Sequence, residues 1–332
     1  MKRNSVIACS ALATLVLISG CGGGVVGKSA AGSSPPAVDR WPLTGQVAPK
    51  TPTEPALSVK IDNAPAAHPQ SGLNQADLVF ECLVEGGMTR FLAVYQSHSA
   101  AVVGPIRSAR PVDGALLRAL NGGIFAYSGA ATGEIAPAKA YSTSFLISDD
   151  ANPGPFWRKS GPPPGNVYSS TAKLRAEAAR RSAHPGLPSP LFTYGPAVPG
   201  SSPARRLSAM VGGTVRASWV YDGASYLRSE NGRPHLLANG QQVRATNVVV
   251  LRVKVTHSGI TDAAGNEDPF VLAYGSGNAE VFRNGVVEHG RWSRPSVTDA
   301  FKFTSTGGGA LTLSPGSSWI ELVPESGSVS PG

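Results

Sequence analysis

Two arginines and a serine are the residues of this chain whose types and spacing most clearly suggest chemistry. They lie in the stretch VVGPIRSARP, where Arg107, Ser108 and Arg110 follow an apolar run and precede Pro111. Because proline is common at the first position of a helix, this pattern predicts a helix that starts at Pro111. A helix start presents unpaired N–H groups and a partial positive charge, to which two guanidinium groups add fixed charge. The arrangement favours a bound anion such as a phosphate, pyrophosphate or carboxylate.

Acidic residues earlier in the chain offer these arginines a different partner. Asp77, Glu81 and Glu85 recur every four residues, which places their carboxylates on one face of either a helix or a strand. They could form a buried ion network with the arginines, or they could orient the arginines around a ligand. Bound anion, internal network and mixed site therefore all stay open. The candidate ligand-binding residues are Arg90, Arg107, Ser108, Arg110, Asp62, Asn63, Asp77, Glu81, Glu85 and Asn166.

The elements that must position these residues form a mixed α/β pattern. Residues 74–85 fit a helix, because Asn74 and Asp77 have capping spacing and the apolar residues between them and Gly86 form one stripe. Alternating apolar residues from Leu78 to Val84 keep a strand open as an alternative. Strands are expected at 56–61, 89–96, 100–106, 123–129 and 145–148, and helices at 111–120 and 172–181.

The pattern changes after the proline-rich segment HPGLPSP at 184–190. Beyond it, short strand-like runs alternate with turn signals up to the end of the chain, which is typical of an all-β domain. The sequence thus predicts an α+β fold, with an N-terminal mixed α/β domain followed by a C-terminal all-β domain. The expected divisions are a signal peptide at 1–20, a flexible tether at 21–54, the α/β domain at 55–185 and the mainly β domain at 186–326.

The N-terminal residues predict export and lipid anchoring. Lys2 and Arg3 precede an apolar run that is too short for a comfortable membrane span, and small residues then lead to Cys21. This order is typical of a bacterial lipobox, so we expect Cys21 to be lipidated and to attach the chain to the membrane. The stretch GGGVVGKS behind it fits a phosphate-loop pattern but lacks the flanking strand and helix that such a loop needs.

Composition and residue spacing exclude several other classes of site. The formal charge of +8 is scattered, which argues against a nucleic-acid-binding protein. No pair of histidines has metal-ligand spacing, so no metal site is expected, and no cofactor is expected either. Cys82 is the one cysteine left once the signal peptide is removed and Cys21 carries lipid, and its apolar surroundings indicate a packing role.

Four motifs of the first half together resemble the YerB-like bacterial lipoproteins: VKIDN, HPQSGLNQADLVFE, VEGGMTRFLAVYQS and VGPIRSARP. Three motifs of the second half fit the second domain of that family: WVYDGASYLR, ATNVVV and GSSWIELVP. The resemblance covers nearly all of residues 42–324 and implies a lipid-anchored envelope protein of two successive domains with no established reaction. His68, Gly165 and Leu236 depart from the family pattern, which weakens any metal or acid–base role at those positions. A looser, fold-level likeness links the GPIRSAR segment to the LytR–CpsA–Psr cell-wall ligases.

Taken together, these features predict a lipid-anchored protein on the extracytoplasmic face of a bacterial cell membrane. We expect it to bind an anionic ligand or partner through an arginine-rich cleft of its N-terminal domain. The expected partners are the membrane, through Cys21, and a cell-wall polymer, a lipid-linked phosphate or an envelope protein. The alternative is an enzyme that acts on a cell-wall polymer or lipid-linked precursor, with an acid from Asp62, Glu81 or Glu85 assisting.

Overall fold

The computed structural model describes residues 38–130, 144–197, 201–261 and 265–332, and the residues from Val38 to Gly332 form one compact unit. The expected signal peptide and Cys21 lie outside the described residues. Among the helices in these ranges, none is both long enough and apolar enough to cross a membrane.

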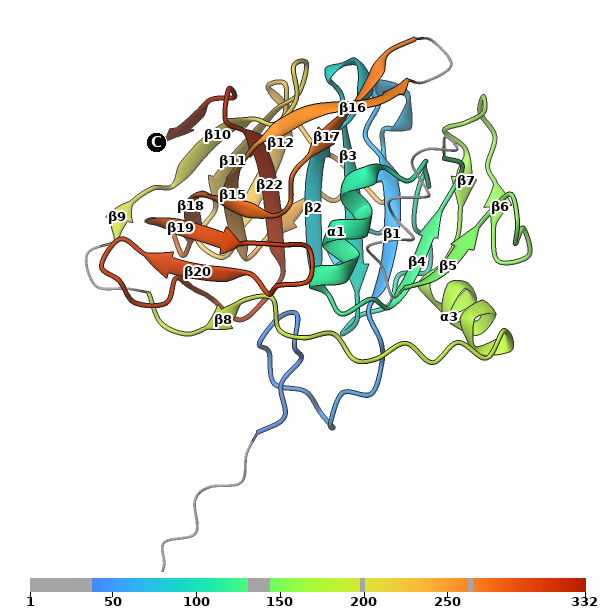
Figure 1. Cartoon of the computed structure of the whole chain (residues 1–332), viewed down its shortest axis with the longest axis horizontal. Helices are drawn as coiled ribbons and strands as arrows, with labels where there is room; N and C mark the ends of the chain where they lie inside the picture. The colour runs from blue at the N-terminus through green and yellow to red at the C-terminus, as the bar shows by residue number, and fades with distance from the viewer. Residues whose placement is uncertain (1–37, 131–143, 198–200, 262–264) are drawn as a thin grey trace, which may run out of the picture. The chain divides into compact units, whose positions relative to one another are not determined.

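A mixed sheet of eleven strands is the largest element of the described chain (Figure 1). Ten of its strands follow the order β20-β19-β18-β15-β22-β2-β3-β1-β4-β5, and β9 pairs with β19. Their bounds are β1 Leu57–Asp62, β2 Leu78–Leu83, β3 Thr89–Tyr95, β4 Ile124–Tyr127, β5 Phe145–Ser148, β9 Ser202–Pro203, β15 Asn247–Val253, β18 Gly275–Arg283, β19 Val286–Arg294, β20 Lys302–Ser305 and β22 Ser318–Pro324.

The two halves of the chain meet inside this sheet. Strand β2 from the first half pairs in parallel with β22 from the second half, and this pairing places Glu81 opposite Glu321. Whether each half folds alone, with a boundary after residue 185, stays a prediction, and the shared sheet is the interface that such a division would have to break.

A second sheet of six strands comes entirely from the second half. It follows the order β13-β12-β11-β10-β23, with β14 paired to β12. Its strands are β10 Arg206–Met210, β11 Arg216–Tyr221, β12 Tyr226–Glu230, β13 Arg233–Pro234, β14 Arg244–Ala245 and β23 Val329–Pro331. The smaller elements are α1 Pro111–Ala119, α3 Thr171–Arg180, the short 3-10 turns Pro65–Ala67, Leu73–Gln75 and Glu85–Gly87, and the strand pairs β6 Trp157–Arg158 with β7 Val167–Tyr168, β8 Thr193–Tyr194 with β21 Thr312–Leu313, and β16 Val255–Thr261 with β17 Glu267–Val271.

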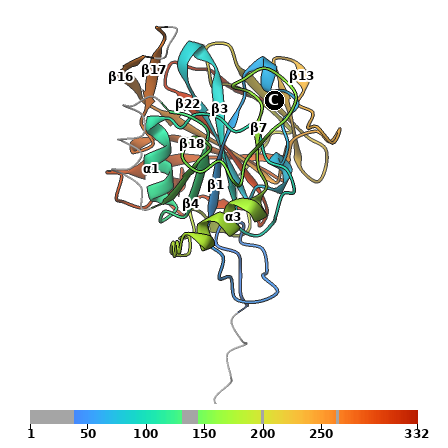
Figure 2. The same cartoon turned by 90° about the vertical axis from the view of Figure 1, so that its right-hand side faces the viewer.

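Apolar side chains fill both faces of the large sheet. On one face, Val59 and Ile61 of β1 belong to the same buried cluster as Trp219 of the second sheet. On the other face, Phe80 of β2 belongs to a cluster with Leu116 of α1. Figure 2 shows the corresponding layers, with α1 on one side of β1 and β3 and with β13 on the other. The fold is therefore α+β, as the sequence predicted, with a mixed first half and a sheet-rich second half.

Helix α1 begins where the sequence predicted. Pro111 occupies its first turn, and the carboxylate of Asp113 accepts a hydrogen bond of 2.7 Å from the backbone N–H of Arg110. At the other end, Asn121 takes a left-handed conformation, and the N–H of Gly122 returns to the carbonyl of Leu117. The start of α1 is thus capped by Asp113, a residue of the chain itself.

Of the two alternatives left open at 74–85, the strand is correct for residues 78–83, and the strand expected at 100–106 was wrong. Residues 78–83 form strand β2 and not part of a helix, because they lie between β22 and β3 with apolar clusters on both faces. Residues 100–106 form isolated bridges and not a strand, because they pair in turn with Ser169, Ser71 and Ile61. Pro105 has no N–H to give to a ladder, which fits this irregular path.

The expected tether at 21–54 was too long at its C-terminal end. Leu43 is fully buried, and the carbonyl of Thr44 accepts a hydrogen bond from the N–H of Gly316. Tyr194 also donates its hydroxyl to the carbonyl of Leu43. Residues 41–45 therefore pack on the compact unit and are not a free linker.

Candidate functional site

The candidate site is built around the end of strand β1, where the side chains of Asp62 and Asn63 lie on opposite faces of the large sheet. Successive residues of a strand point to opposite sides. Lys60 and Asp62 lie on the side of α1, where Lys60 forms a fully buried ion pair of 2.7 Å with Asp113. Asn63 lies on the side of the second sheet, where it donates to Glu230 of β12.

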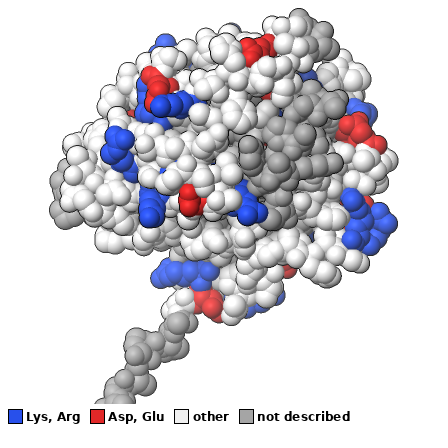
Figure 3. All heavy atoms as spheres, viewed as in Figure 1, with Lys and Arg blue, Asp and Glu red and all other residues white. Residues whose placement is uncertain are grey.

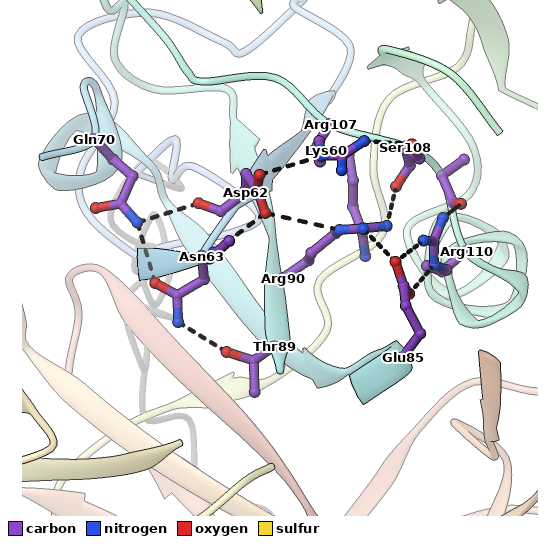
Figure 4. Close-up of polar contacts among 12 residues, drawn as sticks. Lys60, Asp62, Asn63, Gln70, Glu85, Thr89, Arg90, Arg107, Ser108 and Arg110 are labelled. Atoms are coloured by element: carbon purple, nitrogen blue, oxygen red, sulfur yellow. Dashed lines mark hydrogen bonds and ion pairs between the residues drawn. The ribbon is translucent and has the colours of Figure 1, made fainter. Parts of the chain in front are cut away.

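On the α1 side, Asp62 holds Arg107 at the border between interior and solvent. The Nε of Arg107 lies 3.2 Å from Oδ2 of Asp62, and its Nη1 donates to the hydroxyl of Ser108 at 3.3 Å. The side chain of Arg107 is 26% exposed, whereas that of Arg90 is 3% exposed. Figure 4 shows these residues side by side, with Arg90 between Asp62 and Glu85.

Glu85 is the centre of a buried ion cluster. Its carboxylate lies 2.5 Å from Nη2 of Arg90, and it accepts two hydrogen bonds from Arg110, one of them 2.8 Å from Nε (Figure 4). Although burial opposes ionisation, these two guanidinium groups lower the pKa of Glu85 to about 2. The carboxylate of Asp268 also lies 3.3 Å from Arg110.

The charges of this region balance within the fold. Arg90, Arg107 and Arg110 face three carboxylates, those of Asp62, Glu85 and Asp268. Arg90 and Arg110 are buried in this cluster, so their geometry matches the internal network. Arg107 stands apart because part of its guanidinium group still reaches solvent.

The three regularly spaced carboxylates lie apart, and of the three it is Glu85 that contacts Arg110. Glu85 follows β2 in a short turn and contacts Arg90 and Arg110, whereas Glu81 accepts hydrogen bonds from Arg228 at 2.8 and 3.0 Å. Asp77 accepts from the backbone N–H groups of Gln96 and Ser97. The spacing was correct for a strand, but Asp77 and Glu85 lie just beyond the two ends of β2, where the chain changes direction.

Asn166 is far from this region in its contacts. Its Oδ1 accepts from Arg158 at 2.9 Å, and its Nδ2 donates to the carbonyl of Gly161 at 3.0 Å. It therefore closes the loop between β6 and β7 and does not contact the arginine cluster.

On the side of the second sheet, buried charges connect the two halves of the chain. Arg228 of β12 is fully buried and contacts both Glu81 and Glu230. Glu321 lies opposite Glu81 on β22, and its Oε1 accepts a hydrogen bond of 2.9 Å from the indole of Trp219. Burial and the neighbouring Glu81 carboxylate raise the pKa of Glu321 well above its usual range, because one arginine cannot balance two buried carboxylates. This environment therefore favours the protonated form of Glu321.

Sequence reasoning missed this second system. His68, Arg228, Glu230, His235 and Glu321 received no role. The contacts that join them across the two halves, such as that of Arg228 with Glu81, connect residues more than a hundred positions apart. The rings of His68 and His235, for example, lie 4.9 Å apart although no local spacing relates them. A charged residue at the centre of an apolar strand, such as Glu321 in SWIELVP, was the one available signal.

The described residues contain no group of three or more His, Cys, Asp or Glu side chains that could hold a metal ion. Cys82 is buried among apolar residues, and burial raises the pKa of its thiol to about 12. These residues therefore support the packing role expected for Cys82.

Charged side chains are scattered on the surface seen in Figure 3, where small basic and acidic groups are separated by uncharged residues. The arginines of the candidate site are instead mostly interior, as their burial shows. Local geometry, and not a broad basic face, must therefore account for any anion binding at this site.

Comparison with known proteins identifies the family. Residues 43–184 match the profile described as "Protein of unknown function (DUF3048) N-terminal domain", and residues 208–320 match the corresponding C-terminal domain. The chain belongs to this family. The candidate site draws on both matched segments, since Asp62 and Arg107 lie in the first and Arg228 and Glu230 in the second.

Two comparisons with YerB of Bacillus subtilis, one of sequence and one of structure, support the assignment. The chain is 36% identical over 142 residues to "Putative lipoprotein YerB" of Bacillus subtilis (strain 168), a match that covers 42% of this chain and 43% of that protein. The aligned segment thus spans less than half of that relative. The crystal structure of the YerB protein from Bacillus subtilis matches with a TM-score of 0.74 and 26% identity, over 88% of this chain and 99% of that chain.

Proposed function

We propose that this chain is a lipid-anchored protein of the bacterial cell envelope, held at the extracytoplasmic face of the membrane by lipid on Cys21. Two observations support the proposal: the ordered basic, apolar and small-residue segments before Cys21, and the match to a relative named as a lipoprotein. Mass spectrometry of the native N-terminus tests it. We expect a mature chain that begins at lipidated Cys21, and an unmodified Cys21 in a strain with working lipoprotein processing would contradict it.

We further propose that the compact unit binds an oxyanion-bearing ligand, such as a phosphate or pyrophosphate, through Arg107 and Ser108. The observation that carries this proposal is the difference in exposure among the three arginines, since the Arg107 side chain is 26% exposed while Arg90 and Arg110 are buried. Asp62 fixes the Nε side of the Arg107 guanidinium, so its Nη groups keep one orientation. A guanidinium held in this way loses little side-chain entropy when it binds an anion.

The buried arginines have a different part in this proposal. Arg90 and Arg110 support the site by holding Glu85 and the start of α1 in place. Glu85 and Glu81, which were expected to assist a reaction, are engaged by arginines. For Glu85 these contacts favour binding over catalysis, because a carboxylate that two arginines hold ionised is a weak proton acceptor.

Thermal unfolding of the full chain in the presence of inorganic phosphate or pyrophosphate tests the anion site. A ligand that binds only the folded state stabilises it by about 2.7 kcal/mol at a concentration of one hundred times Kd. We expect a rise in melting temperature for the wild type and no rise for Arg107→Ala. Arg158→Ala is the matched control, because Arg158 is also partly exposed and paired to an aspartate, at 3.1 Å from Asp149.

Two outcomes would contradict the proposal. One is a wild-type melting temperature that neither phosphate nor pyrophosphate changes. The other is an equal rise in the wild type and in Arg107→Ala, which would place the anion elsewhere. If Arg107→Ala instead lowers the melting temperature strongly and no anion stabilises the wild type, Arg107 belongs to the internal ion network.

A further inference from the structure

An open groove lies on the second-sheet side of the molecule, apart from Arg107. It has a volume of about 660 Å³, within the usual range of small-molecule sites. Its walls come from the loop after β1 and from the segment that joins β12 to β13 and continues beyond it. The lining residues relevant here are Pro65, His68, Pro69, Glu230, Arg233 and His235.

A chain of hydrogen bonds beneath the groove fixes the orientation of the amide of Gln70. Its Nε2 lies 3.1 Å from both the carbonyl of Asp62 and Oδ1 of Asn63 (Figure 4), so both of its protons are used. Its Oε1 then faces Nε2 of His235 at 2.8 Å, which must carry a proton. Arg228 donates to the other ring nitrogen of His235 at 2.6 Å. These contacts, together with burial and the charge of Arg228, which lower the pKa of His235, indicate a neutral ring.

The same logic fixes the tautomer of His68. Asn63 donates its amide protons to Thr89 and Glu230, each at 2.8 Å, so its Oδ1 is an acceptor. That oxygen lies 3.0 Å from Nε2 of His68, closer than the amide nitrogen of Gln70 at 3.4 Å, so Nε2 of His68 is the protonated nitrogen. Nδ1 of His68 consequently keeps a free lone pair. Burial lowers the pKa of His68 and favours this neutral form.

Glu230 adds a second acceptor to the groove. Its Oε2 accepts from Asn63 and Arg228, at 2.8 and 3.0 Å. Its Oε1 lies 3.6 Å from Nε2 of His68, beyond ordinary hydrogen-bond distance, and the Glu230 side chain is 14% exposed. Arg233 on the rim is exposed and provides donors. The groove thus combines two oriented acceptors with one flexible cationic donor.

We propose that this groove binds a carbohydrate, whose neighbouring hydroxyl groups donate to Nδ1 of His68 and Oε1 of Glu230 while others accept from Arg233. Hydroxyl groups both donate and accept, so a polyhydroxylated ligand satisfies this mixed set. The Glu230 carboxylate would repel a simple anion, and Arg233 and the buried Arg228 would repel a simple cation. The prolines on the walls provide flat apolar surfaces of the kind that the C–H faces of a sugar ring can cover. This site does not depend on anion binding at Arg107.

Saccharide binding to the full chain is tested by calorimetric titration with chitotriose and maltotriose and by cosedimentation with purified peptidoglycan. Binding of a soluble sugar would indicate that the ligand is a free saccharide, and cosedimentation with peptidoglycan would indicate that it is an envelope polymer. We expect at least one of these probes to bind the wild type. Loss of one hydrogen-bonding group should raise Kd about tenfold or more.

His68→Phe keeps a flat ring beside His235 but removes Nδ1, so it should raise the Kd for the bound saccharide about tenfold or more. Because that change also disturbs Asn63, Arg233→Ala serves as a second variant that alters only an exposed side chain. His257→Ala is the control, since His257 is exposed on β16 and does not line the groove. The proposal is overturned if no probe binds the wild type, or if bound saccharide is unaffected in both His68→Phe and Arg233→Ala.

Discussion

Replacing Glu85 by glutamine should destabilise the protein in a strongly pH-dependent way. The carboxylate of Glu85 lies between the buried guanidinium groups of Arg90 and Arg110, which lower its pKa from about 4.5 to about 2. That difference corresponds to about 3 kcal/mol for a fully buried group, and residual solvent screening reduces it to about 2 kcal/mol. Glutamine has nearly the same shape but no charge, so Glu85→Gln removes this stabilisation and leaves the buried arginine cluster with one carboxylate too few.

The sign of the effect follows from the direction of the shift. A lowered pKa in the folded state stabilises the fold above the unfolded-state pKa, and this contribution is lost as the pH falls from about 4.5 to about 2. Urea unfolding from pH 7 to pH 3 should therefore show a gap of about 2 kcal/mol or more between wild type and Glu85→Gln at neutral pH, which narrows in acid. Glu54→Gln is the matched control, because Glu54 also pairs with an arginine, Arg175, but its side chain is 55% exposed. Equal stability at pH 7, or a gap that does not narrow in acid, would refute the role given to Glu85.

Three further predictions test other buried groups. Because the pKa of Glu321 is raised in the folded state, the unfolding free energy of the wild type should fall as the pH rises above about 4.5, by up to about 1.4 kcal/mol per pH unit. Glu321→Gln should remove this slope in urea titrations. An unchanged slope in the mutant would count against a protonated Glu321. Lys60→Met should cost about 3–5 kcal/mol, because it leaves the buried carboxylate of Asp113 unpaired, whereas the exposed Lys50→Met should change little in the same unfolding measurement. Cys82 is fully buried, and its thiol pKa is raised to about 12. It should therefore resist iodoacetamide at pH 8 in the native protein and react after denaturation, which peptide mapping would show. Rapid labelling of the native protein would contradict its burial.

The sequence was most informative where structure is determined locally. Pro111 predicts the start of α1, and the apolar run before Asp62 predicts β1, because these signals lie within one turn or one strand. It was ambiguous at 74–85, where helix and strand periods both fit, and the pairing of β2 with β22 favoured the strand. No local pattern could report that pairing, since its partner is more than two hundred residues away.

The candidate site was predicted only in part for the same reason. The arginines and the nearest carboxylates could be named from sequence, and Arg110 does contact Glu85. Which arginine remains exposed depends on Asp268 of β17 and on the turn after β2, and neither could be placed from the sequence. The groove beside His68 was missed because its two walls come from residues near 68 and near 235.

The most direct test of the central claim is a crystallographic search for an anion beside Arg107. Crystals of the full chain soaked in tungstate, a heavy analogue of phosphate, would locate bound oxyanions by anomalous scattering. The account predicts a peak within hydrogen-bond distance of the Arg107 guanidinium and the Ser108 hydroxyl, which Asp62 holds in position. A map with no peak there, or with tungstate bound only at other places, would contradict the proposed anion site.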